Sequence, residues 1–220
     1  MNMLEMLSST VLAGLVLSSI THIIPVIQKK LAYQNQFIQE IADVEFAMQV
    51  MARGIRQAGF GFKPNPWIGK KLQSPTPQEW TPIQILKNST LKTGPIGAGI
   101  ATSKNNQGLI NDAMILSHIP FGHFDCLGRK ITPNRTNKSL AHLGFFIQQS
   151  NSSGRSGALM CHSLDQKGVA QNDSILAGVK YFELESLPPS TRDMLGIRIK
   201  ITTQSGRLYE QVVALRNTPI

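Results

Sequence analysis

The chain has 220 residues, of which 41% are hydrophobic and 16% charged. This length provides one or two domains with a buried core, and the composition excludes a disordered chain, a charged coiled coil and a disulfide-dense small protein. The net charge is +9, with −2 on residues 1–50 and +11 on residues 51–220, so the later part of the chain would attract polyanions.

The first predicted element is a membrane-spanning helix. Twenty-three residues without a formal charge separate Glu5 from Lys29. As an α-helix they extend about 35 Å, enough to cross a hydrocarbon core of about 30 Å. A cleaved signal peptide is the alternative, but acidic Glu5 stands where basic residues precede such a signal. Ser, Thr and His interrupt the run, which suits a helix that packs against other helices.

The helical pattern continues after this segment with a change of character. Apolar residues recur at steps of three and four from Leu31 to Ala58, which predicts an amphipathic helix that ends at Gly59. Pro25 predicts a kink near residues 21–25. We therefore expect residues 1–28 to form a transmembrane or filament-core half of one long helix, and residues 29–58 to form its amphipathic half.

The rest of the chain, residues 59–220, is expected to form a β-sheet domain. Residues 62–108 are rich in Pro, Gly, Asn and Thr, which predicts irregular structure with at most a short strand at residues 83–86. Alternating or apolar runs then predict strands, and Gln204-Ser205-Gly206 predicts a hairpin turn. The expected strands are residues 113–119, 140–148, 157–162, 175–187, 195–203 and 207–216. The fold class predicted is α+β, an antiparallel sheet covered by the amphipathic half of the helix.

A family resemblance appears at the start of the chain. The segment from Met3 to Leu7, with Glu5 at its centre, then an apolar run with Gly14 and a later proline, resembles the N-terminus of type IV pilins and pseudopilins. The segment 55–61 resembles the arginine–alanine–glycine–aromatic motif of PilW-type minor pseudopilins. Four later segments are similar to that group in order and spacing: residues 125–128, 158–161, 178–183 and 213–217. The chain departs from the family at Met1 and Asn2, where phenylalanine and threonine are usual.

The resemblance implies a pilin-like fold and a role in filament assembly. A minor pseudopilin of this type lies in the bacterial inner membrane with its domain in the periplasm, is matured by a prepilin peptidase and can be methylated at its N-terminus. It joins other minor pilins, the major pilin and the inner-membrane assembly platform, initiates the filament and is a candidate for its tip. The function implied is therefore assembly, without enzyme activity.

Glu5 is the residue with the clearest expected role. A carboxylate at the end of an apolar helix is costly unless it is paired. Its available partners are the positive end of the helix dipole and a free α-amine, either its own at Met1 or that of a neighbouring subunit. The amine of a neighbour would set the register between subunits. Gly14 and Pro25 are the residues that we expect to shape helix packing.

Cys126 and Cys161 both fall in the expected sheet domain. They could be two unrelated buried thiols or a disulfide, and a domain that follows a membrane anchor can face an oxidising compartment. We favour the disulfide, which would close a loop of 36 residues. Two lone cysteines lack the ligand spacing of a structural zinc site.

No catalytic motif or cofactor site is evident. His118 and His123, with Asp112 and Asp125, could form a metal or acid–base cluster, but no HExxH pattern is present, and His118 falls in a strand and His123 in a turn. We therefore expect neither a metal nor a cofactor. The sequence contains no nucleophile elbow and no phosphate-binding loop.

Several basic residues are candidates for binding DNA, although a solvated basic surface is the favoured interpretation because aromatic residues for base stacking are few. These residues are Arg129, Lys130, Arg135, Lys138, Lys70, Lys71, Lys87 and Lys92. Two further functions remain open. One is a minor pseudopilin of a type II secretion system, and the other is a membrane-anchored extracytoplasmic hydrolase or binding protein.

Overall fold

The computed structural model describes residues 3–58, 82–93, 100–104, 111–119, 124–132, 140–149, 157–165, 169–188 and 194–215. One helix, α1, spans Met3–Gln57. The strands are β1 (Ile83–Leu86), β2 (Ser89–Thr93), β3 (Ile100–Lys104), β4 (Ala113–His118), β5 (Ala141–Gln149), β6 (Gly157–Leu164), β7 (Ala170–Leu187), β8 (Gly196–Thr203) and β9 (Leu208–Ala214). The chain divides into two compact units, Met1–Glu45 and Phe46–Ile220.

Helix α1 continues through Pro25 without a break. Proline lacks the amide hydrogen that would bond to the carbonyl four residues earlier, so the helix gives up one hydrogen bond there. Close by, the Thr21 hydroxyl donates to the Ser18 carbonyl at 2.8 Å, which is the return bond to the backbone that hydroxyl side chains make in helices. In the part of the chain that the structure describes, no helix combines the length and the apolar character needed to cross a bilayer. The membrane-spanning role of residues 1–28 stays a prediction.

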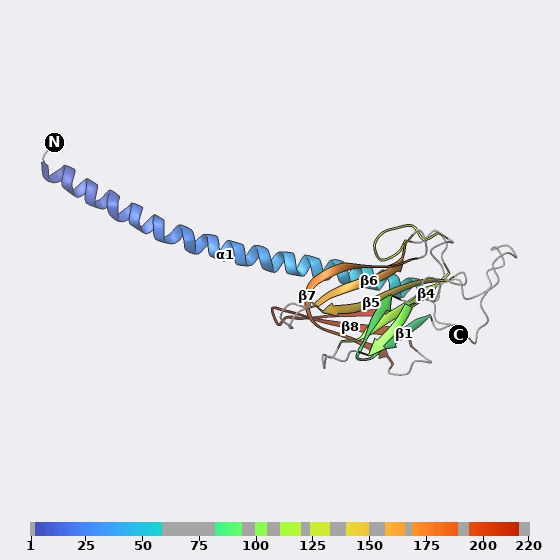
Figure 1. Cartoon of the computed structure of the whole chain (residues 1–220). Coiled ribbons are helices and arrows are strands. Elements are labelled where there is room, and N and C mark those ends of the chain that lie inside the picture. The colour runs from blue at the N-terminus through green and yellow to red at the C-terminus, as the bar shows by residue number, and fades with distance from the viewer. Residues whose placement is uncertain are drawn as a thin grey trace. The chain divides into compact units, whose positions relative to one another are not determined.

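Seven strands form one antiparallel sheet in the order β1-β4-β5-β6-β7-β8-β9, and β2 pairs with β3 in a separate hairpin. Figure 1 shows the sheet strands gathered at the C-terminal end of α1. Each strand from β4 to β8 pairs with the strand that follows it, a meander that short connections favour. The turn at Gln204-Ser205-Gly206 joins β8 to β9 as the sequence predicts, with Gly206 at φ 83°.

The sheet curls because its longest strand is irregular. β7 has 18 residues, and its pairing with β6 shifts register twice, between Gly157 and Leu159 and again between Leu159 and Met160. Its pairing with β8 shifts once more, between Val179 and Tyr181. Gly178, in the same stretch, has φ 70°. Extra residues of this kind bend a strand and increase its twist, so β7 can pair with β6 through its first half and with β8 through its second.

Two polar residues fasten the curled sheet to itself. We call Asn111 and Asp112, which immediately precede β4, the clasp. Asp112 N donates to the Phe182 carbonyl at 2.8 Å, and the Asn111 side chain accepts from Phe182 N at 3.0 Å. Asp112 Oδ2 accepts from Leu184 N at 2.8 Å. The clasp thus pairs with the edge of β7 beyond its last contact with β6, and the start of β4 meets β7 although β5 and β6 lie between them in the sheet.

A lysine completes this junction. Lys87 lies 2.8 Å from Asp112 Oδ2 and also donates to the Leu184 carbonyl. The Asp112 side chain is only 3% exposed, whereas that of Lys87 is 60% exposed. Asn88 N donates to the other Asp112 oxygen at 3.2 Å. Burial removes a carboxylate from water at a large cost in free energy, and these three donors offset that cost for Asp112.

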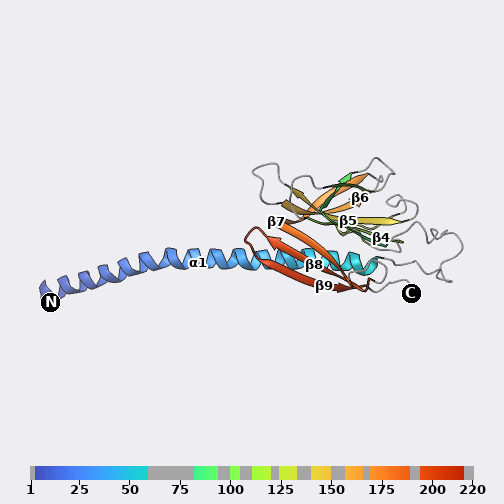
Figure 2. The same ribbon diagram turned by 90° about the horizontal axis from the view of Figure 1, so that it is seen from below.

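The core of the second unit lies between the sheet and the last turns of α1. Met51 and Ile55 are fully buried, as are Phe145 and Ile199 from the strands. A Cβ atom at Gly54 would lie 2.9 Å from Leu116 Cδ1 and within 4 Å of two β5 side chains, so glycine permits close approach of helix and sheet. In Figure 2 the C-terminal turns of α1 run beside the strands.

The predicted α+β, pilin-like fold, in which residues 29–58 form a helix that covers the sheet, is wrong. The body is predominantly strand, in a large curled antiparallel sheet of seven strands, and it contains only the part of α1 from Phe46 onward. Residues 29–43 belong to the other compact unit and are exposed except for half-buried Glu40. The reason is physical: apolar periodicity shows that a helix face needs cover, but it does not specify what covers it.

The predicted strands are confirmed more closely than the architecture. The strand at residues 83–86 and the six later strands occur within a few residues of the expected ranges, except that β7 begins five residues earlier. The hairpin of β2 and β3 was missed, because it lies among the Gly, Pro and Asn residues that predicted irregular structure. Leu91 of β2 is buried with Ile115 and Phe146, so tertiary packing stabilises a segment of weak local preference.

Replacing the clasp aspartate tests its role in the fold. Asp112→Ala removes the acceptor of three hydrogen bonds and leaves Leu184 N without that acceptor in a buried position, so we expect a loss of about 3 kcal/mol in the free energy of unfolding. Urea denaturation followed by far-UV circular dichroism measures it. Asp43→Ala, at an exposed helix position, is the matched control and should change stability by less than about 0.5 kcal/mol. Equal effects of the two substitutions would contradict the assignment.

Candidate functional site

The exposed apolar side chains of α1 are the first candidate site. Ile23, Ile27, Leu31, Ile38 and Ile41 recur at steps of four, seven and three residues, and therefore share one face of the helix. Their exposed fractions run from 38% at Ile41 to 63% at Ile38. Ile24, Val26 and Phe37 border this face and are also exposed. We call these eight residues the apolar helix face. Lys30 and Gln34 interrupt this face, so it is an apolar stripe with polar gaps. Exposed apolar side chains grouped in this way are typical of a surface that another molecule covers.

The predicted assembly residues lie before this face or within it. Glu5 and Gly14 belong to α1, as expected, but the environment of the Glu5 side chain lies outside the described part of the structure. Met1 lies outside the described residues altogether. Pro25 is exposed between Ile24 and Val26. The roles of Glu5, Met1, Gly14 and Pro25 in assembly therefore remain predictions.

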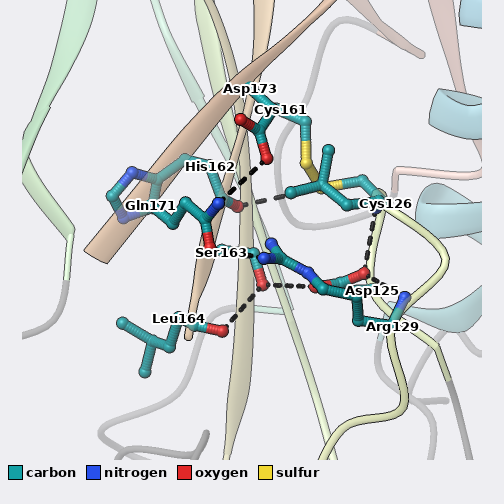
Figure 3. Close-up of polar contacts among 10 residues, drawn as sticks. Asp125, Cys126, Arg129, Cys161, His162, Ser163, Leu164, Gln171 and Asp173 are labelled. Atoms are coloured by element: carbon teal, nitrogen blue, oxygen red, sulfur yellow. Dashed lines mark hydrogen bonds and ion pairs between the residues drawn. A yellow bond between two sulfur atoms is a disulfide. The ribbon is translucent and has the colours of Figure 1, made fainter. Parts of the chain in front are cut away.

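A disulfide joins Cys126 to Cys161, as predicted, with the two Cα atoms 6.2 Å apart. Cys161 lies in β6, and Cys126 lies in a turn between Phe124 and Lys130, which we call the disulfide loop. Figure 3 shows the bridge beside the polar contacts of this loop. The disulfide therefore ties an irregular segment to the middle of the sheet.

Asp125 organises the disulfide loop from within. Its Oδ1 accepts from Leu127 N at 2.9 Å and from Arg129 N at 2.7 Å, while its Oδ2 accepts from the Ser163 hydroxyl at 3.0 Å. Arg129 Nε lies 3.2 Å from the same Oδ2. The Arg129 guanidinium continues the network to Gln171 on β7, as Figure 3 shows. The loop is consequently held to β6 twice, by the disulfide and by the Asp125–Ser163 bond.

A cavity of about 390 Å³ lies between the disulfide loop and the last turns of α1. Phe46, Val50 and Arg53 of α1 line one wall, and Phe124 and Leu127 of the loop line another. The Arg53 guanidinium lies 5.8 Å from the centre of the Phe124 ring, a cation–π distance. The cavity is mainly apolar with one cation at its wall, and no described group in it has the arrangement of a nucleophile and a base.

A polar row crosses the middle of the sheet. His142 Nδ1 lies 2.9 Å from the Ser117 hydroxyl on β4, and His162 Nδ1 contacts Asn172 Oδ1 on β7. Burial lowers the pKa of His142, and nearby His162 lowers it further. Burial also lowers the pKa of His162, while its hydrogen bond to Asn172 acts in the opposite direction. Both imidazoles are therefore neutral near pH 7.

The four residues considered as a metal or acid–base cluster do not act together in the described structure. Asp112 belongs to the clasp, and Asp125 belongs to the disulfide loop. His118 is fully buried in β4, and His123 lies outside the described residues. Among the residues that the structure describes, no group of three His, Cys, Asp or Glu side chains could hold a metal ion.

Some of the basic residues proposed for DNA binding have other partners. Arg129 pairs with Asp125, and Lys87 pairs with Asp112. Arg135, Lys138, Lys70 and Lys71 lie outside the described residues, and the side chain of Lys92 does too. Ion pairing reduces the charge that Arg129 and Lys87 offer to a phosphate, and DNA binding stays an untested prediction.

The outer face of β7, β8 and β9 carries a separate set of ion pairs. Arg198 lies 3.0 Å from both Glu185 and Glu210, and Lys200 lies 2.8 Å from Glu185. Hydrogen bonds from Lys200 and then Arg198 lower the pKa of Glu185, and the bond to Glu185 raises the pKa of Lys200. These exposed pairs neutralise one another, so this face is not a cationic patch.

Sequence reasoning missed the roles of Asn111, Asp112 and Asp125. The signal for Asp125 was present: Asp at the first position and Gly128 at the fourth is a type I turn pattern, and Gly128 has φ 74°. Nothing local marks Asn111 and Asp112, because their partners lie about 70 residues away.

No family model, curated protein or solved structure matches this chain.

Removing the disulfide is expected to reduce stability while the loop stays in place. The double substitution of Cys126 and Cys161 by Ser should lower the free energy of unfolding by up to about 3.8 kcal/mol, the chain-entropy value for a loop of this length. The Asp125–Ser163 bond remains, so amide hydrogen exchange at Leu127 and Arg129 should stay slow under native conditions. Adding Asp125→Ala to the double variant should make that exchange fast. Fast exchange in the cysteine variant alone would show that Asp125 does not hold the loop.

The buried histidines predict a stability that decreases on acidification. Both have a pKa in the folded protein below that of the unfolded chain, so the unfolded state binds more protons below about pH 6.5. Stability should be constant above about pH 7.5 and should fall as the pH decreases to 5.5. Urea denaturation at four pH values measures this dependence. His142→Gln with His162→Gln should flatten the profile in that range, whereas His22→Gln, at an exposed helix position, should not.

Proposed function

We propose that this chain is a filament-assembly subunit of the minor pseudopilin type. The observation that carries the proposal is the apolar helix face, because the eight side chains that form it are exposed in the single chain. Each buried methylene contributes about 0.8 kcal/mol, so equivalent helices of neighbouring subunits would gain substantially by packing on this face. The proposal rests on the helix and the N-terminal motif, and not on the fold of the sheet domain.

Glu5 supplies the register in this proposal. The carboxylate belongs to the first turns of α1, and the helix dipole favours an acid there. When helices pack side by side, the N-terminal amine of one subunit at Met1 can pair with Glu5 of another. In an apolar surrounding each partner alone would be penalised, so the pair favours one vertical offset between subunits. Such pairing is selective as well as stabilising.

The proposal also specifies where the subunit lies before assembly and which proteins it meets. Before assembly the subunit is held at the inner membrane by residues 1–28, with residues 59–220 in the periplasm. A prepilin peptidase produces the mature N-terminus, and the assembly platform then transfers the subunit to a filament with other minor pilins and the major pilin. An oxidising periplasm is compatible with the disulfide between Cys126 and Cys161.

The decisive experiment replaces Glu5 in the full chain. Glu5→Ala removes the carboxylate without changing the sheet, so we expect at least a tenfold loss of incorporation into sheared filaments, measured by immunoblot in the native host. Asp43→Ala, an exposed acid on the same helix, should incorporate normally. Unchanged far-UV circular dichroism of the purified variants would confirm that the sheet is folded.

Two outcomes would contradict the proposal. Normal incorporation of Glu5→Ala would remove the role of the carboxylate. A chimera in which an unrelated single-pass anchor replaces residues 1–28 provides the second test, since an assembly subunit should lose function and a tethered enzyme or binding protein should keep it. Co-purification with pilus or with secretion components distinguishes the two filament machines.

A further inference from the structure

Two histidines on neighbouring strands have a geometry that assembly does not require. In the strand register Ser117 lies opposite His142, Gly144 lies opposite His162, and His162 lies opposite Asn172. Residues opposite one another, or two apart along one strand, point to the same side of a sheet. Ser117, His142, His162 and Asn172 therefore form one row across β4, β5, β6 and β7, which we call the histidine row.

The two rings are held in a similar way. His162 Nδ1 donates its proton to Asn172 Oδ1, which leaves the lone pair on Nε2. His142 is held through Nδ1 by the Ser117 hydroxyl at 2.9 Å. Metal-binding histidines commonly show this pattern, in which the nitrogen that does not bind the ion is fixed by a second polar group.

His162 Nε2 lacks a partner in the described structure. The residue is only 1% exposed, and no described group hydrogen-bonds to this atom. A buried polar atom without a hydrogen bond costs about 1–3 kcal/mol and requires an explanation. Because the lone pair points into the structure, the explanation must supply a donor or a cation.

The second ring is close enough to contribute. His142 is diagonal to His162 across the β5–β6 pair, and side chains in this relation are about 7–8 Å apart at their backbones, within reach of long side chains. Gly144, directly opposite His162, places no side chain between them. The electrostatic effect of His162 on the pKa of His142 agrees with this proximity. His142 is half-buried, so solvent can reach the His142 side of the pair.

We propose that His142 and His162 bind one divalent transition-metal ion through their Nε2 atoms. Imidazole nitrogen is a preferred ligand of Zn²⁺, Ni²⁺ and Cu²⁺, and not of Mg²⁺ or Ca²⁺. Since no third His, Cys, Asp or Glu is grouped with them among the described residues, water completes the coordination. Affinity should follow the order Cu²⁺ above Ni²⁺ and Zn²⁺. This inference is independent of the assembly function.

Calorimetric titration of the full, chelator-treated chain with Zn²⁺, and separately with Mg²⁺, tests the proposal. We expect one equivalent of Zn²⁺ to bind and Mg²⁺ not to bind. His142→Gln and His162→Gln should each weaken Zn²⁺ binding at least tenfold, and Asn172→Ala, which keeps both rings, should weaken it about tenfold. His22→Gln, at an exposed helix position, is the control and should bind like the original chain.

X-ray absorption of the Zn²⁺-loaded chain gives a readout that does not depend on the folding of a variant. The spectrum should show scattering from two imidazole rings, with Zn–N distances of about 2.0–2.1 Å. Absence of Zn²⁺ binding would overturn the proposal. So would binding that persists in the variant with both histidines replaced, or a spectrum without imidazole scattering.

Discussion

The whole sheet depends on hydrogen-bond partners for the backbone of the second half of β7. β6 pairs with β7 only as far as Val179, and the backbone groups of Phe182 and Leu184 would otherwise face the interior without partners. The clasp supplies them: Asn111 and Asp112 meet Phe182 and Leu184 N, and Lys87 meets the Leu184 carbonyl. Buried backbone groups must be paired. A strand that leaves one pairing for another therefore needs substitute partners, and the side chains of Asn111, Asp112 and Lys87 with the Asp112 backbone amide provide them here.

The same principle explains the disulfide loop. An irregular segment packed against a sheet has backbone amides that no strand can satisfy, and the Asp125 carboxylate accepts from two of them while it also reaches Ser163. The covalent bridge at Cys126 fixes the position of the loop, and the carboxylate fixes its conformation. Asp112 in the clasp and Asp125 in the disulfide loop are both buried, and each accepts hydrogen bonds from several donors. One carboxylate therefore takes the place of a separate acceptor for each amide.

The two parts of α1 differ in how far the chain itself covers their apolar side chains. From Phe46 onward, α1 finds its cover within the chain, and Met51 and Ile55 are completely buried. Before that point, Ile23, Ile38 and the rest of the apolar helix face remain uncovered in the single chain. The helix has 55 residues, more than four times the usual length, and helices in proteins draw most of their stability from packing of an apolar face. This contrast underlies the interpretation of the chain as one component of an assembly.

The sequence by itself determined the elements that depend on local periodicity. These are the helix that ends near Ala58, the strands after residue 112, the turn before Gly206 and the two cysteines as partners. Only the tertiary structure decided the curl of the sheet, the clasp and the β2–β3 hairpin, because each depends on contacts between residues distant in the chain. The predicted α+β architecture failed for that reason. Periodicity specifies which side of an element must be buried. The bulges of β7 and the hydrogen bonds of Asp112 to β7 decide which other elements that side packs against.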